Sequence, residues 1–441
     1  MSLETLAPWL AVIAKCVFSV AFVMQIVPLL IWAERKGAAY IQDRPGPNRA
    51  DILGIRAGGL VHTLNDVVKL IMKEDIVPGH VEKRYWAAAP VISMTVALIT
   101  FSVVPFGDKI SLPVGDKTFD VLLQVSNMDG GLLFVLAMTG IGVYGVMLAG
   151  WASNNKFSLL GGLRASAQMV SYELAMGLSA VVVFLLTGSV SLTKIAAAQS
   201  GAIWHWNVFT VPGFIAFLLF WIAAFAETNR TPFDLPEGEA ELVGGYHTEY
   251  SSLRFALFFM AEYANMIVAS AVTATLFFGG YNVPFLDGTA IREHADVLLT
   301  VLGFGAVPAF LFFAFVAWKR RNRPFYRELK PNDIRHREPK FFAAVWTGAA
   351  VAHAGLGVLG LAGVVGASPL GQDGVAFVLQ LSALVVKVLI GCWIFIWVRW
   401  TVPRFRYDQL MDLGWKMMLP AALGNVFLAA IWVIVQTNLA N

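Results

Sequence analysis

The sequence predicts an all-α membrane protein that crosses a bilayer about ten times. Hydrophobic residues make up 58% of the 441 positions and charged residues only 14%, whereas soluble domains are about half apolar and about a quarter charged. The mean hydropathy is +0.67. Apolar runs of about 20 residues, the length that a helix needs to span a bilayer, recur along the whole chain.

Ten runs are apolar and long enough to be spans, and most are rich in Val, Ile, Leu and Phe. They cover residues 8–33, 86–106, 131–150, 168–188, 209–226, 255–280, 297–318, 341–366, 375–398 and 417–438. No basic segment precedes the first run and no small-residue cleavage site follows it. We therefore expect a retained anchor and not a signal peptide.

The charges of the connections predict which side each one faces. Connections 33–85, 151–167, 227–254, 319–340 and 399–416 together hold 26 Lys and Arg residues, and the opposite connections hold four. Basic loops stay in the cytoplasm. This set is therefore predicted to be cytoplasmic, and both termini are predicted to be periplasmic.

The residue counts exclude several kinds of site. The only cysteines, Cys16 and Cys392, lie in separate apolar runs, and the seven histidines are scattered. An iron–sulfur cluster or a cysteine-rich zinc site needs about four ligands. We expect the chain to bind no metal, flavin or nucleic acid, and to have no catalytic redox centre of its own.

Two cytoplasmic connections are unusual. In connection 33–85, apolar residues between 60 and 71 fall on one helical face, which predicts an amphipathic helix on the membrane surface. That face packs either on the protein or against lipid or a partner. Connection 227–254 carries six acids against two arginines, which is unexpected in a cytoplasmic loop and marks a candidate site.

Ionisable residues inside the predicted spans are the second kind of candidate. A charge at the centre of a bilayer costs roughly 2.5–3.5 kcal/mol on insertion scales, so a retained one usually faces protein or water. Glu173, Glu262 and Lys387 lie well inside their runs. They form either static pairs and hydrogen bonds between helices, or sites along a path for protons.

The acidic connection has a pattern of its own. Pro232 and Pro236 interrupt any helix, because proline lacks an amide hydrogen and pushes the preceding residue toward extended backbone. Pro236 can begin a new helix in which Glu237 and Glu241 are i,i+4 neighbours. Such neighbours raise each other's proton affinity, which suits a proton relay. The alternative is an acidic loop that docks on basic partner surfaces.

Four strings at the cytoplasmic side carry a family resemblance. The first is AERKG with YIQDRPGPNR and KLIMKED (33–37, 40–49, 69–75), and the second is LLGGLR through QMVSYE (159–173). The third is AETNRTPFDLPEGEAEL, followed by AEY (226–242, 261–263), and the fourth is PRFRYDQL (403–410). Together they resemble the NuoH family, the quinone-site membrane subunit of respiratory complex I, which includes the mitochondrial first ND subunit.

The resemblance implies an eight-helix core with an addition. Residues 1–282 and 375–441 follow the family order, as spans 1–6 and the last two spans. Residues 283–374 hold two extra spans and a basic cytoplasmic loop. We expect this segment to be an inserted transmembrane hairpin that faces lipid or another subunit.

The resemblance also assigns residues to two roles. It implies a proton relay that includes Glu173, Glu227, Asp234, Glu237, Glu239, Glu241, Glu262 and Lys387. It places quinone binding at Glu34, Arg35, Lys36, Phe258, Phe259, Met260, Tyr263 and Arg399. The arginines after residue 398 have an alternative role as anchors to phospholipid headgroups.

The implied protein is a non-redox subunit of a proton-translocating NADH:quinone oxidoreductase in the bacterial inner membrane. Its substrate is ubiquinone or menaquinone. Its partners are the quinone-site and terminal iron–sulfur subunits of the peripheral arm, the neighbouring small membrane subunits and lipids. The alternatives are the membrane subunit of a related energy-converting hydrogenase, an independent ion transporter, and a scaffold.

Overall fold

The structure is a computed structural model that describes residues 3–114, 117–236, 243–322 and 336–440. In this part of the chain, nine helices are long and apolar enough to cross a membrane, and an apolar tenth is shorter. The one sheet there is an antiparallel pair, β1 (Lys109–Val114) and β2 (Lys117–Leu122), with Lys109 opposite Leu122. The predicted class, an all-α polytopic membrane protein, is confirmed.

Each predicted span overlaps one helix. The long helices are α1 (Leu3–Ile41), α3 (Lys83–Phe101), α4 (Gly131–Ala152), α5 (Lys156–Thr187), α9 (Ser252–Phe277), α11 (Ala295–Lys319), α13 (Arg337–Leu361), α14 (Pro369–Thr401) and α16 (Leu419–Ala440). The shorter one is α7 (Val211–Glu227). Short helices α2 (Val61–Met72), α6 (Leu192–Ala198), α10 (Gly288–Glu293) and α15 (Tyr407–Asp412) connect them, and a π-helical stretch (Leu413–Met418) joins α15 to α16.

Several predicted boundaries were wrong. The predicted connection 151–167 is reduced to residues 153–155, because α5 already begins at Lys156, where the Asn155 side chain accepts a hydrogen bond from the Phe157 amide. Helix α1 continues past its apolar run to Ile41, since Glu, Arg and Lys are good helix formers. The run 255–280 ends its helix at Phe277, because Gly279 and Gly280 take positive φ values.

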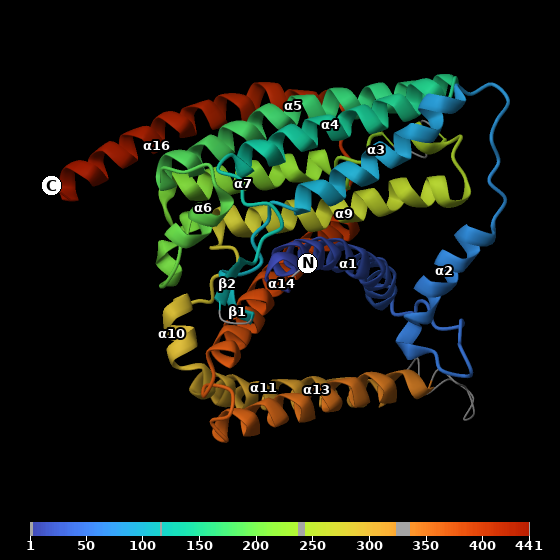
Figure 1. Ribbon diagram of the computed structural model, residues 1–441. Helices are drawn as coiled ribbons and strands as arrows, with labels where there is room; N and C mark the ends of the chain where they lie inside the picture. The colour runs from blue at the N-terminus through green and yellow to red at the C-terminus, as the bar shows by residue number, and fades with distance from the viewer. Residues whose placement is uncertain (1–2, 115–116, 237–242, 323–335, 441) are drawn as a thin grey trace.

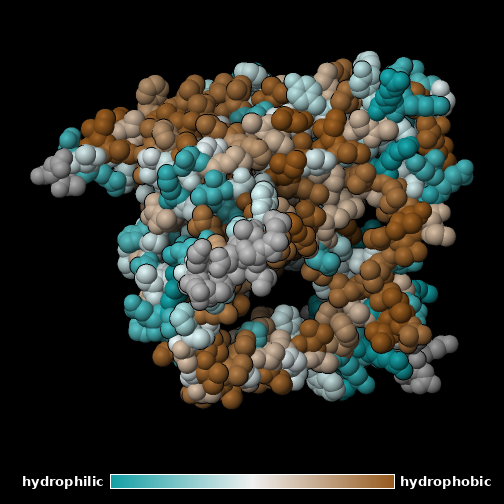
Figure 2. Space-filling view, viewed as in Figure 1, coloured by the Kyte–Doolittle hydropathy of each residue, from teal (hydrophilic) through white to brown (hydrophobic). Residues whose placement is uncertain are grey.

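The helices form a main bundle and a separate hairpin (Figure 1). Helices α3, α4, α5, α7, α9 and α16 lie in the main bundle, and α1 and α14 cross next to α9. Helices α11 and α13 pack against each other as a further layer. Hydrophobic residues cover much of the outside, and hydrophilic residues gather mainly at the two ends of the bundle (Figure 2).

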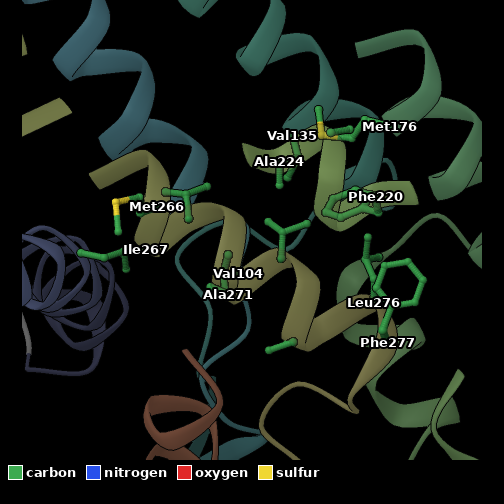
Figure 3. Close-up of a cluster of buried hydrophobic side chains, with 14 of the residues drawn as sticks. Val104, Val135, Met176, Phe220, Ala224, Met266, Ile267, Ala271, Leu276 and Phe277 are labelled. Carbon is green, nitrogen blue, oxygen red and sulfur yellow. The ribbon is translucent and has the colours of Figure 1, made fainter. Parts of the chain in front are cut away.

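The core is centred on α9. Its residues Met266, Ile267, Ala271, Leu276 and Phe277 are buried and belong to one hydrophobic cluster that also contains Phe220 and Ala224 of α7 (Figure 3). The ring of Phe277 packs at a tilt against that of Phe220, with ring centroids 5.7 Å apart. Helix α9 is therefore held rigidly by its neighbours, which matters because it carries both Glu262 and Tyr263.

The predicted amphipathic helix at 60–71 is confirmed as α2. Its apolar residues Leu64, Val68 and Ile71 are each more than half exposed. The helix stands at the side of the bundle (Figure 1). Within the described residues this face is largely uncovered, which favours the alternative that it contacts lipid or a partner.

Close backbone packing explains the LLGGLR string. A Cβ atom at Gly161 would lie 2.8 Å from the Tyr246 amide nitrogen, and one at Gly162 would lie 3.1 Å from Cα of Gly150. Both glycines thus let backbones approach α5 closely, as small residues do in membrane bundles. Gly161 in this way lets the part of the acidic connection at Gly245 and Tyr246 pack directly on α5.

Candidate functional site

Four segments meet at the carboxylate of Glu34, near the predicted cytoplasmic end of the bundle. The Tyr263 hydroxyl of α9 donates to Glu34 Oε2 at 2.7 Å. Arg230 Nη1, just after α7, lies 3.5 Å from the same oxygen, and Arg399 of α14 pairs with Glu34 Oε1. We call Glu34, Arg230, Tyr263 and Arg399 the Glu34 cluster.

Arg230 is the buried charge of this cluster. Its side chain is 5% exposed, and its guanidinium carbon lies 4.1 Å from the centre of the Tyr263 ring. Burial disfavours its charged form, but Tyr263, Glu34 and Glu262 together raise the pKa of Arg230 above the ordinary arginine value. Its Nε and Nη2 atoms have no hydrogen-bond partner within the described residues. They are therefore available to a ligand or to water.

The chain after α7 is held in an irregular path by Gln168 of α5. The Gln168 side-chain amide donates to the carbonyls of Ala226 at 2.8 Å and Phe233 at 2.9 Å, and more weakly to Asn229 Oδ1 at 3.2 Å. No helix runs through 228–236, as the two prolines predict. This clamp fixes where Arg230 enters the Glu34 cluster.

A second ion pair lies beside the cluster. Arg404 donates to Asp234 at 2.8 Å, with the Asp234 side chain buried and Arg404 half-exposed. The backbone amide of Phe405 donates to the carbonyl of Pro232 at 3.2 Å. The PRFRYDQL string therefore holds the acidic connection in place. The predicted acids Glu237, Glu239 and Glu241 of this connection lie outside the described residues.

An internal cavity of about 70 Å³ lies next to the cluster. Glu227 and Glu262 contribute to its wall, together with polar side chains of Thr228, Asn229, Tyr246 and Asn265. The Tyr246 hydroxyl donates to Glu262 at 3.0 Å. Glu227 is buried, and its Oε2 atom has no hydrogen-bond partner among the residues described. We call this the acidic cavity.

The acidic cavity has the size and polarity for water. A buried water needs roughly 10–15 Å³ of such space and two to four polar partners, so the part of the cavity beside the carboxylates can hold water. Glu173 of α5 interacts electrostatically with Glu227. The predicted acids Glu173, Glu227 and Glu262 are thus brought to one region, where carboxylates and water can pass protons.

The predicted quinone-binding residues divide into groups. Phe259 packs edge-on against Tyr263, with ring centroids 5.0 Å apart, and belongs with the Glu34 cluster. Phe258 instead packs on Tyr246 and lines the acidic cavity, because neighbouring residues of a helix point in different directions. Met260 is partly buried against the core.

Arg35 and Lys36 point away from Glu34. Arg35 pairs with Asp66 of α2. Lys36 is buried, forms an ion pair with Glu338 of α13 at 2.5 Å and donates to the carbonyl of Pro45 at 2.5 Å. These two residues connect α1 with other parts of the chain.

Lys387 lies apart from the acids. Its ammonium group donates to the carbonyls of Gly280 and Asn282, each at 2.8 Å, and lies 4.7 Å from the centre of the Trp206 ring. These hydrogen bonds join α14 to the loop after α9, which favours the alternative of a static structural contact for Lys387. In the described residues, no group of three or more His, Cys, Asp or Glu side chains is placed to hold a metal ion.

Three residues of the site were missed by sequence reasoning. Arg230 and Gln168 both stand in the recognised strings, but nothing local shows that one is buried and the other clamps a distant loop. Tyr246 lies in the acidic connection, but it is not one of the acids and nothing in the local sequence marked it. A buried arginine beside Tyr263 becomes visible only when the helices are assembled.

The fold and the site define a polytopic membrane protein with a buried charged cluster that adjoins an acidic cavity. The chain belongs to the NADH dehydrogenase family, whose model matches residues 14–331 and 340–430. The predicted resemblance is therefore confirmed. The match includes most of 283–374, and the status of that segment as an insertion stays a prediction.

Relatives at substantial identity carry consistent names. A protein of Leptospira biflexa that is named as a subunit of NADH-quinone oxidoreductase is 43% identical over 91% of this chain and 89% of its own. A protein of Flavobacterium psychrophilum, named as the same subunit, is 40% identical over 96% of each chain. A Rhodothermus marinus protein, also named as a subunit of NADH-quinone oxidoreductase, is 40% identical over 96% and 97%.

The Gln168 clamp yields a stability prediction. Gln168→Leu keeps the side-chain size but leaves the buried carbonyl of Phe233 without a donor among the described residues and removes the shortest hydrogen bond to the carbonyl of Ala226. Each such loss costs about 1–3 kcal/mol, so we expect thermal denaturation of the purified protein complex to shift clearly downward. The matched control is Gln436→Leu, at an exposed position of α16. Equal shifts for both variants would contradict the clamp.

Proposed function

We propose that this chain is the membrane subunit of a proton-translocating NADH:quinone oxidoreductase, in which it forms the quinone chamber with the peripheral arm and couples quinone reduction to proton movement. One observation carries the coupling. Arg230 lies 3.5 Å from Glu34 and 4.1 Å from the ring centre of Tyr263, whose neighbour Glu262 lines the acidic cavity, so one buried charge lies between the Glu34 cluster and that cavity.

The Glu34 cluster supports quinone binding. A quinone site needs an apolar channel with a few polar groups that fix the headgroup. Here Arg399 and the nitrogens of Arg230 that have no partner within the described residues supply donors, and the aromatic ring of Phe259 lies beside Tyr263. The substrate is ubiquinone or menaquinone. Its electrons come from the terminal iron–sulfur subunit, since we assign no redox centre to this chain.

The acidic cavity supports the coupling. A change in charge at the quinone alters the field at Arg230, and Glu262 lies within the reach of that charge. Glu262 shares the cavity with Glu227, and Glu227 interacts with Glu173. Protons would pass along this order into the membrane. The resemblance adds Asp234, Glu237, Glu239 and Glu241 at its cytoplasmic start.

The chain is an integral membrane protein. We propose the bacterial inner membrane as its location, with both termini periplasmic and the Glu34 cluster near the cytoplasmic face. The strong excess of Lys and Arg in the connections on that side supports this orientation. The quinone-site subunit of the peripheral arm would then dock beside residues 226–242, and small membrane subunits would cover the exposed apolar helices.

The coupling is tested at Glu227. We expect Glu227→Gln to lower NADH-driven proton translocation at least about tenfold in membrane vesicles, because a positioned proton-transfer group is removed. Proton uptake is measured with a pH-sensitive dye, alongside the rate of NADH oxidation. Glu293→Gln, at an exposed position of α10, is the matched control. Normal proton translocation by the assembled Glu227→Gln complex would refute the relay.

The quinone assignment is tested at Arg399. We expect Arg399→Gln to raise the KM for a short-chain quinone about tenfold, since a charge-assisted hydrogen bond contributes about 1.5 kcal/mol or more. The control is Arg406→Gln, because Arg406 is exposed and pairs with Asp408 at the surface. An unchanged KM for the Arg399 variant, or an equal rise for both variants, would remove Arg399 from the quinone site.

A further inference from the structure

Within the described residues, the α11–α13 hairpin meets α1 at one end. There Glu338 of α13 is paired with the buried Lys36, and Phe342 packs on Trp32 with ring centroids 6.0 Å apart. Elsewhere the hairpin forms a separate layer in Figure 1, and an opening separates it from the layer above in Figure 2. The join between α1 and the hairpin is therefore narrow.

A cleft of about 690 Å³ opens beside this join. The deeper part of its wall is aromatic. There Trp32 of α1 lies opposite Phe313, Phe342 and Trp346 of the hairpin. Its rim is basic, with Lys319 and Arg320 at the end of α11. Apolar depth and a cationic rim within one cleft match an amphiphile with a negative headgroup.

The rim charges are not neutralised by the part of the protein that the structure describes. No acidic side chain there lies within ion-pair distance of Lys319 or Arg320. Glu338 also lines the cleft, but it is engaged by Lys36 at 2.5 Å and by the Tyr40 hydroxyl at 3.0 Å. Arg320 rests on the Tyr40 ring, 3.9 Å from its centre, which holds its guanidinium at the rim.

The rim also lies at the level of lipid headgroups. Helix α11 is an apolar helix of 25 residues that ends at Lys319, and a helix of this length spans a bilayer completely. Basic side chains at such a helix end meet phosphate groups on the cytoplasmic leaflet. The aromatic part of the cleft then lies at the depth of the acyl chains.

We propose that this cleft is a binding site for one anionic phospholipid. Its phosphate would lie on Lys319 and Arg320, and its acyl chains would run along Trp32, Phe342 and Trp346. The lipid would thereby add to the small area of contact between the hairpin and α1. This assignment depends on the cleft alone and does not rest on the reaction of the complex.

The test is photolabelling of the intact complex. The complex is placed in phosphatidylcholine nanodiscs that contain a trace of phosphatidylglycerol with a diazirine in its acyl chain, and labelled peptides are identified by mass spectrometry. We expect labels near Trp32, Phe342 and Trp346. Lys319→Gln with Arg320→Gln should weaken labelling about thirty-fold, at about 1 kcal/mol for each basic side chain.

Two further variants separate charge from folding. Lys319→Arg with Arg320→Lys keeps both charges and should retain labelling. Arg337→Gln with Lys340→Gln removes two exposed charges of the same hairpin outside this cleft and should also retain it. Assembly of each variant is checked on a native gel, so that lost labelling is counted only for intact complexes.

Competition identifies the occupant. Unlabelled phosphatidylglycerol should displace the probe, whereas phosphatidylcholine, inorganic phosphate and a short-chain quinone should not. The proposal is overturned if phosphatidylcholine competes equally well, if phosphate or quinone displaces the probe, or if the double glutamine variant labels normally. Cross-links from Phe342 or Trp346 to a helix of a neighbouring subunit would overturn it as well.

Discussion

The burial of one arginine constrains the whole end of the molecule that carries the proposed site. A buried charge without a partner costs several kcal/mol, so Arg230 requires compensating groups around it. Glu34 comes from α1, Tyr263 from α9, and Arg399 approaches the same carboxylate from α14. These helices are distant in sequence. Their relative positions are fixed by the need to place compensating groups around the buried charge of Arg230.

The same constraint explains why the proposed quinone site and the acidic cavity are neighbours. Tyr263 and Glu262 are adjacent on α9, so a helix that offers its hydroxyl to Glu34 also turns a carboxylate into the cavity. Gln168 fixes the path of the chain that carries Arg230. A change of charge at the bound quinone would therefore reach the acidic cavity through a single residue, Arg230.

Much of the fold could be predicted from the sequence, because the length of an apolar run predicts a membrane span and the charge of a loop predicts its side of the membrane. Helix ends were predicted less well. Helix α1 extends beyond its apolar run, where Lys36 is paired with Glu338, about 300 positions away, and no local pattern shows such a partner. The acids Glu173 and Glu262 could be selected as site candidates because charges in spans are costly.

The finer parts of the site depend on how the helices are rotated against each other. Phe258 and Phe259 are equally plausible in the sequence, yet only Phe259 faces Tyr263.

The central claim is that Glu34 is the compensating charge for Arg230, and a double-mutant cycle on the thermal stability of the intact complex tests it most directly. Glu34→Gln should destabilise the complex by about 3–5 kcal/mol, because it leaves a buried arginine without its carboxylate. Adding Arg230→Gln should restore a large part of that loss, since the cycle isolates the energy of the pair. Strictly additive effects of the two substitutions would contradict the account.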